Sequence, residues 1–521
     1  MDTTTSRPPL LFEAAAQWLV SKTKENRLPL LSSLALGLLG YTFAFTNKFL
    51  NHDEVTSLFS KGATVDSGRW GLGALDSIFP NYSMPWIYGI LTIALMAVAC
   101  TVMIHVFDLR SKPLQVLLCG SVILFPSLIG TFAFMFTSSS YGLSFLLSVL
   151  AVWFVCQKDR KLWLPGLACM ILSLSIYQSY IAISASMLVL VLIRQLLHGE
   201  ALAPVIKRGF LYVGFLVVSL GLYYAATQLV LILKDAEFND YASDRVIFSL
   251  ATLLDGVRLA YTHFFQTFTQ LRHRLIPTEF SRTVHYICLA GAALLLVLWA
   301  LAQEKKEPGR FLLLAALIAV LPLAVNCMFL FTAEDAIHTL VLYGFVAVYL
   351  LLIIVAEACI PLYFSGKAPE WLRRVLADVV AFGLAVIVMV NIYVANTSYL
   401  ALHLQYETTY AFYTSLLADI KMMPEFTEGT KLAVIGTWQY PEYYDDHFEY
   451  TRSLTGLYSF GPDLYSKEKF LEYYLGIDLP VVSQSTVDKI KETPEFAEMA
   501  VYPYYGSLKL IDNVLVVKLS Q

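Results

Sequence analysis

Residues 86–107 read WIYGILTIALMAVACTVMIHVF and contain no Asp, Glu, Lys or Arg. A helix needs about 20 apolar residues to cross the hydrocarbon core of a bilayer, so this stretch predicts a transmembrane helix. Similar stretches recur along the chain and predict a polytopic α-helical membrane protein with about eleven transmembrane helices. The predicted spans are 29–47, 86–107, 113–131, 140–156, 163–178, 180–197, 209–233, 285–302, 311–331, 339–362 and 377–396.

The composition agrees with a membrane protein and excludes several other classes. Of the 521 residues, 57% are hydrophobic and only 15% are charged, and the mean hydropathy is +0.63. The net charge of −4 and the lack of a basic stripe argue against nucleic-acid binding. All seven cysteines fall in or at the ends of predicted spans, so they predict neither a disulfide framework nor a zinc site.

The short loops alternate between basic and non-basic, which predicts the orientation. Cytoplasmic loops of membrane proteins carry an excess of Lys and Arg. The short loops near 132–139, 179 and 332–338 carry none, so the N-terminus is expected to be cytoplasmic and the segment after the eleventh span to be extracytoplasmic. The basic residues on the opposite side are Arg7, Lys22, Lys24, Arg27, Arg110, Lys112, Lys158, Arg160, Lys161, Arg194, Lys207, Arg208, Lys305, Lys306, Arg310, Lys367, Arg373 and Arg374.

This orientation divides the chain into three parts. Residues 1–28 form a cytoplasmic amphipathic N-terminal segment, and residues 29–396 form the transmembrane domain with outer loops 48–85 and 234–284. Residues 397–521 are expected to form a periplasmic α/β domain.

Local patterns predict the elements of this last domain and one interfacial helix. An amphipathic stretch in the second outer loop is expected to lie along the membrane interface. In the C-terminal domain, Thr493-Pro494 has the order of a helix cap followed by proline, and Asp512-Asn513 lies between two apolar runs as in a hairpin. The amphipathic stretch is 246–268; the helices of the domain are expected at 399–422, 466–475 and 486–492, and its first strand at 431–436.

The first outer loop offers two carboxylates, Asp53 and Glu54, a few residues after the first span. At that position they lie at the depth of lipid headgroups, where a catalyst acting on a lipid-linked phosphate needs its base. Exposed acids at a helix end are also common, and they solvate readily. The same loop contains Arg69 and Trp70. An arginine fork can hold a phosphate bidentately, but interfacial Trp and headgroup-binding Arg are frequent at any membrane surface.

Two further outer segments carry polar residues. Tyr177, Gln178 and Tyr180 sit at a tight turn, where they either line a cavity or satisfy the turn itself. A short loop with Glu334, Asp335 and His338 either joins the same site or caps a helix. The tail is rich in tyrosine, which suits both sugar rings and a membrane interface.

Taken together, several of these segments resemble the membrane glucosyltransferase family of the type-specific O-antigen glucosyltransferases, the Gtr type II group. The matching pieces are spread over nearly the whole chain in the expected order. They are Asp53-Glu54, Gly68-Arg69-Trp70, Tyr177-Gln178-Ser179-Tyr180, Tyr502-Pro503-Tyr504-Tyr505-Gly506-Ser507 and Val516-Val517-Lys518-Leu519.

The resemblance implies a GT-C-like hexosyltransferase of the bacterial inner membrane. Such an enzyme moves a sugar, here glucose, from a polyprenyl-phosphate donor to a periplasmic glycan such as the O-antigen of lipopolysaccharide. It implies an outer acid as base at Asp53 or Glu54 without fixing which of the two; Glu54 is favoured because glutamate has the longer reach. Arg69 and then His338 are expected to contact the phosphate, with Trp70, Tyr177, Gln178 and Tyr180 as further substrate-binding residues. No cofactor is required; a divalent metal, if one is used, would be held by Asp53 and Glu54.

Two other functions share the topology. A flippase or transporter of lipid-linked sugars would carry charged residues at mid-span and a repeat symmetry, and neither is found in the sequence. A polysaccharide polymerase or ligase would have a dominant central outer loop and no folded tail.

Overall fold

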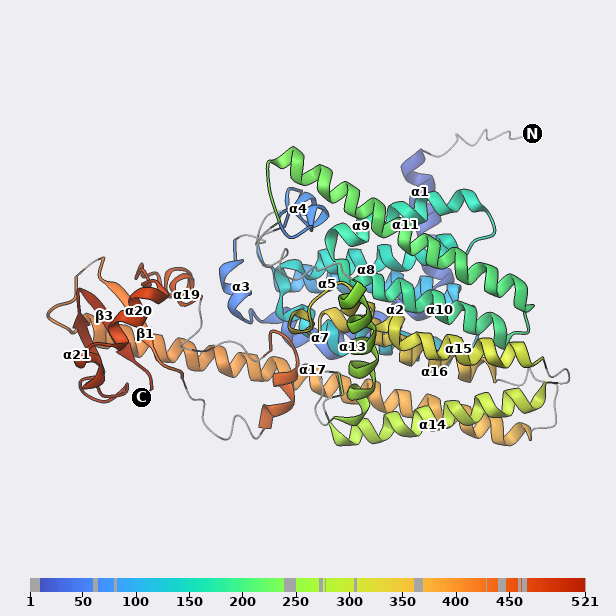
Figure 1. Ribbon diagram of the computed structural model, residues 1–521. Coiled ribbons are helices and arrows are strands. Elements are labelled where there is room, and N and C mark those ends of the chain that lie inside the picture. Colours follow the sequence, from blue (N-terminus) through green and yellow to red (C-terminus); the bar gives the residue numbers. More distant parts are fainter. Residues whose placement is uncertain are drawn as a thin grey trace, which may run out of the picture.

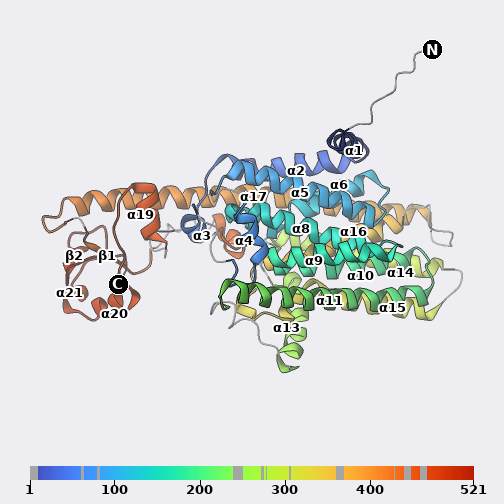
Figure 2. The same cartoon turned by 90° about the horizontal axis from the view of Figure 1, so that it is seen from above.

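The computed structural model describes residues 10–59, 64–78, 82–238, 250–270, 275–276, 278–303, 307–359, 369–427, 429–438, 447–457, 461 and 466–520. Long helices lie side by side in a bundle (Figures 1 and 2). Within the described residues, nine helices are long and apolar enough to cross a membrane. They are α2 (Arg27–Thr46), α5 (Pro85–Val106), α8 (Met135–Val155), α10 (Ile181–Leu197, preceded by the 3-10 turn η2, Gln178–Tyr180), α11 (Leu202–Lys234), α14 (Glu279–Ala302), α15 (Pro308–Val325), α16 (Val346–Ala358, preceded by η5, Val341–Phe345) and α17 (Glu370–Lys421).

Two of the eleven predicted spans have a different form. The stretch 113–131 is a broken pair, α6 (Lys112–Ile123) and α7 (Pro126–Ala133), bent by 41°. Pro126 begins α7, and because proline cannot donate a backbone hydrogen bond the helix breaks there. The stretch 163–178 contains α9 (Trp163–Ile176), whose 14 residues are fewer than a full crossing needs. The count of eleven therefore stays a prediction.

Buried tyrosines bond to backbone carbonyls on both sides of the break between α6 and α7. In an apolar interior, an unpaired carbonyl is costly. The hydroxyls of Tyr41, Tyr343 and Tyr399 reach this region from α2, η5 and α17. Tyr41 donates to the carbonyl of Ile123 at 2.8 Å and Tyr343 to that of Val122 at 2.6 Å, at the end of α6, and Tyr399 donates to the carbonyl of Ile129 in α7 at 2.7 Å. Side chains from three other elements thus stabilise the broken pair of helices.

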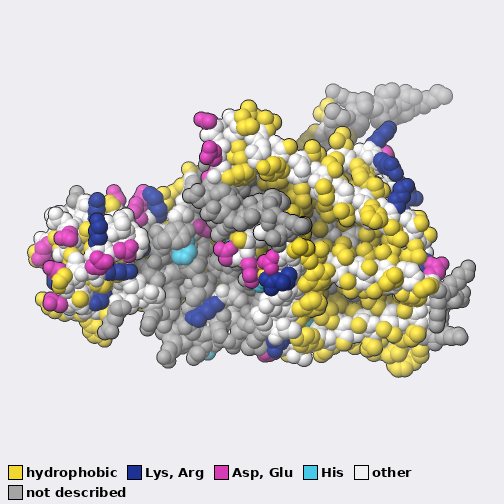
Figure 3. Space-filling model, in the orientation of Figure 1, with side chains coloured by type: hydrophobic (Ala, Val, Ile, Leu, Met, Phe, Trp, Pro, Cys, Tyr) yellow, Lys and Arg dark blue, Asp and Glu magenta, His cyan; other side chains and the backbone are white. Residues whose placement is uncertain are grey.

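The basic loops gather at one end of the bundle. Arg194 at the end of α10 pairs with Asp108 at 2.9 Å, and the buried Glu357 of α16 accepts the backbone N–H of Arg110 at 2.9 Å. Arg310 reaches the carbonyl of Leu196 at 3.3 Å. Figure 3 shows hydrophobic side chains covering the visible face of the bundle, and a group of Lys and Arg at the end away from the tail. The helices α1 (Leu11–Glu25), η1 (Arg160–Leu162) and α13 (Leu250–Thr269) lie outside the set of nine.

The opposite end carries the polar segments. It holds α3 (His52–Thr56) and α4 (Trp70–Asp76), and the tail domain lies beyond it (Figure 1). The 3-10 turns η3 (Cys327–Leu330) and η4 (Glu334–Ala336) precede η5. The amphipathic stretch predicted at 246–268 appears as α13, and its first four residues lie outside the described residues. Its side chains pack on η3, where the ring of His263 stacks on Phe329 with centroids 4.6 Å apart.

Helix α17 joins the bundle to the tail without interruption. The sequence predicted a span at 377–396 and a separate helix at 399–422, but one helix of 52 residues covers both. Residues 396–399 contain neither Gly nor Pro, so nothing in the local sequence ends the helix. The expected boundary at residue 397 therefore falls inside a rigid element that carries the tail on its far end.

The tail is a small α/β unit. Its sheet has the order β1-β3-β2, with β1 (Lys431–Ile435) parallel to β3 (Val514–Lys518) and β2 (Leu508–Ile511) antiparallel to it. The predicted hairpin is confirmed, because Asp512 and Asn513 both have positive φ, as a two-residue turn between twisted strands requires. Thr493 caps α21 as predicted. The remaining elements are η7 (Glu449–Ser453), α19 (Lys467–Leu475), α20 (Gln484–Lys491) and α21 (Pro494–Ala497).

A cysteine-accessibility experiment tests the predicted orientation. Ala201 is exposed between α10 and α11 at the basic end, and Ser485 is exposed in the tail. In a cysteine-free background, an impermeant thiol reagent is expected to label Ser485→Cys and to spare Ala201→Cys in cells with a permeabilised outer envelope. Because both sites are exposed, detergent-solubilised protein should label at each. Labelling of Ala201→Cys in intact inner membranes would reverse the orientation.

Candidate active site

Glu54 lies on the short helix α3, directly after the first long helix. Asn51 caps α3: its side-chain oxygen accepts the backbone N–H of Glu54 at 2.8 Å. The amide nitrogen of Asn51 donates to the carbonyl of Ala133 at 2.7 Å, where α7 ends. The cap therefore ties α3 to the junction between α7 and α8 and turns Glu54 into the protein.

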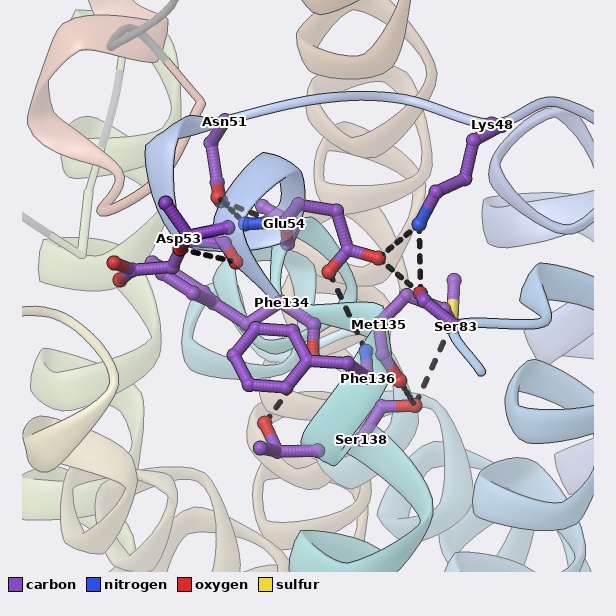
Figure 4. Close-up of polar contacts among 12 residues, drawn as sticks. Lys48, Asn51, Asp53, Glu54, Ser83, Phe134, Met135, Phe136 and Ser138 are labelled. Carbon is purple, nitrogen blue, oxygen red and sulfur yellow. Dashed lines mark hydrogen bonds and ion pairs between the residues drawn. The ribbon is translucent and has the colours of Figure 1, made fainter. Parts of the chain in front are cut away.

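The carboxylate of Glu54 is enclosed by partners from three other segments (Figure 4). Oε1 is bonded to Lys48 Nζ and to the hydroxyl of Ser83, and Lys48 also donates to Ser83 at 2.7 Å. Oε2 faces the backbone N–H of Phe136 at 3.4 Å. That N–H belongs to the first turn of α8, where the helix leaves its N–H groups unpaired and the helix dipole favours an anion. The site thus stabilises a negative charge.

The pair is asymmetric in its exposure. The side chain of Glu54 is 1% exposed and that of Lys48 is 24% exposed. A buried charge with no partner is strongly destabilising, so each member of the pair depends on the other. The lysine is the member that an approaching anion can reach first.

Asp53 has a different environment from its neighbour. It is exposed, and its carboxylate points away from that of Glu54 (Figure 4). The two acids therefore do not form a shared pair of metal ligands. Within the described ranges, no group of three or more His, Cys, Asp or Glu is arranged to hold a metal ion.

A second cluster joins the Gly-Arg-Trp and Tyr-Gln-Ser-Tyr segments. Gln178 donates to the carbonyl of Ser67 at 3.1 Å and to the hydroxyl of Tyr223 at 3.0 Å, and Tyr223 donates to the carbonyl of Gly68 at 3.0 Å. Gly68 has φ of +76°, and a Cβ there would lie 2.8 Å from the Tyr223 oxygen, so glycine is required for this close approach.

The side chains of this cluster continue onto α8 and α11. Arg69 donates to the hydroxyl of Tyr141 at 3.3 Å, and the Tyr141 ring stacks on Tyr177 with centroids 4.2 Å apart. Trp70 donates to Thr227 of α11 at 3.2 Å. Tyr180 is a core residue with 2% exposure, so its ring supports the turn from inside.

The two clusters share the first turns of one helix. Phe136 contacts Glu54 and Tyr141 contacts Arg69, and both belong to α8. Five residues of helix rise by about 7.5 Å, so the helix positions the acid and the arginine a short way apart at the same end of the bundle.

The third predicted segment is engaged elsewhere. Glu334 pairs with His263 of α13, with Nε2 and Oε1 2.8 Å apart. His338 adjoins Thr339, whose hydroxyl bonds to that of Thr455 in the tail at 2.7 Å. This loop links α13 and the tail to the bundle.

The tail domain reaches the acid from the other side. Helix α19 packs against α3, and the rings of Tyr473 and Phe59 meet at 5.0 Å. Burial, together with the negative charge of Glu54, raises the pKa of the Tyr474 hydroxyl above its usual range, so this phenol stays protonated. The tail thus contributes aromatic side chains to the surroundings of Glu54.

Three residues of this arrangement escape sequence reasoning: Lys48, Ser83 and Tyr474. Lys48 precedes Glu54 by six residues and Ser83 follows it by 29, and no continuous helix or strand contains either of them together with Glu54, so periodicity could not pair them. Tyr474 is one of many tyrosines in the tail. The one available signal was that Lys48 immediately follows the first apolar run.

Comparison with known proteins identifies the family. The family model of the glucosyl transferase GtrII matches residues 42–351, more than half of the chain. The matched segment includes α3, α4, η2 and the first turns of α8, which hold both clusters. No curated protein and no solved structure matches the chain. The family match agrees with the glucosyltransferase resemblance of the sequence motifs, and the chain therefore belongs to the GtrII glucosyl transferase family.

Proposed function

We propose that this protein transfers glucose from a polyprenyl-phosphate donor to a cell-surface glycan such as O-antigen, at the periplasmic face of the bacterial inner membrane. Membership of the GtrII family supports transfer of a glucosyl group. The observation that carries the proposed site is the enclosed carboxylate of Glu54 at the end of the bundle opposite the basic loops. By the positive-inside rule, this end faces the periplasm.

The chemistry follows from the position of Glu54. An acceptor hydroxyl loses its proton to the Glu54 carboxylate as its oxygen attacks the anomeric carbon of the donor. The bond between that carbon and the phosphate oxygen breaks, and its electron pair leaves with the polyprenyl phosphate. One displacement inverts the anomeric centre. The proton on Glu54 then passes to solvent, which restores the base.

Cationic side chains stabilise the leaving phosphate in this scheme. Arg69 has a planar fork of donors, and its contact with Tyr141 directs it toward the stacked tyrosines. Preorganised donors of this kind supply a large part of the barrier reduction in group transfer. His338, at the junction of bundle and tail, is the second candidate. The phosphate is a good leaving group, so the scheme includes no metal.

Substitution of the two acids tests the base. Glu54→Gln keeps an oxygen that accepts from Lys48 and Ser83 but cannot take a proton, so transfer is expected to fall by at least about 10²-fold. Asp53→Asn is expected to cause a much smaller loss, because Asp53 is exposed and faces away. The measurement is glucosyl transfer from a synthetic polyprenyl-phosphate glucose to O-antigen, with products read by mass spectrometry.

The matched control is Glu425→Gln, which removes an exposed acid from the same side of the protein. All variants are compared at equal membrane levels. If Glu54→Gln, Asp53→Asn and the double variant all retain near-normal transfer, the first outer loop does not hold the base and the mechanism is wrong.

We also propose that the tail domain holds the acceptor glycan over Glu54. Truncation after Ser398 is a poor test, since it removes the fully buried Tyr399, whose hydroxyl bonds to Ile129 in the bundle. A point substitution in α19 leaves that packing intact. Tyr473 lies at the contact with the first outer loop, where an aromatic face can stack on a sugar ring.

Tyr473→Ala is therefore expected to raise the KM for the acceptor about fivefold and to leave the KM for the donor unchanged. Steady-state kinetics with each substrate varied in turn measure both constants. Tyr505→Ala, which removes a fully exposed ring of the tail outside α19, serves as the control. An unchanged acceptor KM in Tyr473→Ala would remove α19 from the acceptor site.

A further inference from the structure

The partners around Glu54 leave no room for an acceptor hydroxyl to reach its carboxylate. A general base must lie within hydrogen-bond reach of the proton that it removes. Both oxygens of Glu54 are already engaged, by Lys48 and Ser83 on one side and by the N–H of Phe136 on the other. With 1% of its side chain exposed, the carboxylate has no face that an acceptor hydroxyl can approach. One of its partners has to leave before it can act.

Of the three partners, only Lys48 is suited to leave. The N–H of Phe136 belongs to the backbone of α8, and Ser83 is buried with 8% exposure. Lys48 is 24% exposed, and its ammonium group is a point charge on a flexible four-carbon stem. It follows the end of α2, at the membrane surface where the phosphate of a lipid-anchored donor lies.

We propose that Lys48 is a phosphate-binding residue of the donor site, and that it moves from Glu54 to the donor phosphate when the donor binds. This inference rests on the proposed function and adds to it a residue and an order of events. The phosphate replaces the carboxylate as the counter-ion of Lys48, so no buried charge is left unpaired during the exchange. Ser83 and the N–H of Phe136 remain on Glu54 and keep its carboxylate oriented.

The exchange has a consequence for the reaction. Before the donor arrives, Lys48 is paired with the Glu54 carboxylate and covers it, so Glu54 cannot activate a hydroxyl. Once Lys48 turns to the phosphate, the Oε1 side of Glu54 opens toward the acceptor. Donor binding therefore precedes productive acceptor binding, and the lysine couples the two.

A direct binding measurement separates this role from a purely structural ion pair. The full-length protein is placed in phosphatidylcholine nanodiscs and titrated with undecaprenyl phosphate, which has the phosphate and the lipid but no sugar. Lys48→Gln is expected to weaken binding about tenfold, because a charge-assisted hydrogen bond is lost. Glu54→Gln is expected to tighten binding about threefold or more, because it removes the group that competes for Lys48 and repels the phosphate.

The test is that the two substitutions change the affinity for undecaprenyl phosphate in opposite directions. If the pair were only structural, both substitutions would weaken binding or neither would change it, and either result overturns the proposal. Lys48→Arg, which keeps the charge, is expected to recover most of the affinity. Lys234→Gln is the matched control, since Lys234 is an exposed lysine at the end of α11. Thermal unfolding of every variant shows that the compared proteins are folded.

Two further titrations identify the ligand. Inorganic phosphate and phosphatidylglycerol are titrated under the same conditions, and neither is expected to show the opposite responses of Lys48→Gln and Glu54→Gln. If phosphatidylglycerol shows them equally, Lys48 is a general headgroup site and the proposal is wrong. Because no sugar or acceptor is present, these results stand apart from the transfer assay, so a failure of glucosyl transfer and a failure of phosphate binding are distinguishable.

Discussion

In hydrocarbon, a helix has to pair the N–H and C=O groups of its own backbone. The candidate site of this protein depends on the places where helices end and leave such groups unpaired. Long apolar stretches such as α5 and α16 meet this requirement fully. The breaks at the ends of α6 and α7 do not, and they free carbonyl and N–H groups within the protein. At the first break, the hydroxyls of the buried Tyr41 and Tyr343 donate to the carbonyls of Ile123 and Val122. At the second break, at the end of α7, the carbonyl of Ala133 accepts a hydrogen bond from the amide of Asn51, and the N–H of Phe136 faces the carboxylate of Glu54.

The candidate site is therefore built from the exceptions to helical regularity. Backbone groups that would pair with each other in a continuous helix instead bond to the short helix α3, through Asn51, and to the carboxylate of Glu54. Within the first two turns of α8 lies Tyr141, whose hydroxyl accepts a hydrogen bond from Arg69 of the second cluster. A rigid helix thus sets the spacing between an acid and a cation, which a loop could not hold as reliably.

The tail domain adds a second rigid constraint. Because α17 continues from the bundle into the tail, the position of α19 over α3 does not depend on a flexible linker. Aromatic contacts between the end of α17 and the tail, such as Phe412 with Trp438 at 4.8 Å and with Tyr502 at 5.3 Å, keep the sheet attached to this helix. Burial, together with the hydrogen bond that Tyr502 donates to Asp419, raises the pKa of the Tyr502 phenol to about 12. The enclosure of Glu54 is consequently shared between the matched family segment and the C-terminal domain.

The sequence by itself determined the features that depend on near neighbours. Hydropathy over some 20 residues predicts the long helices, and Asp512-Asn513 predicts a hairpin, because each rests on residues that are close together in the chain. Adjacent acids after the first span also marked the region of the site. Only the tertiary structure decided that Glu54 turns inward and Asp53 outward, and that Lys48, Ser83 and Phe136 surround one carboxylate. Those contacts join residues 6, 29 and 82 positions apart, and packing between separate helices creates them.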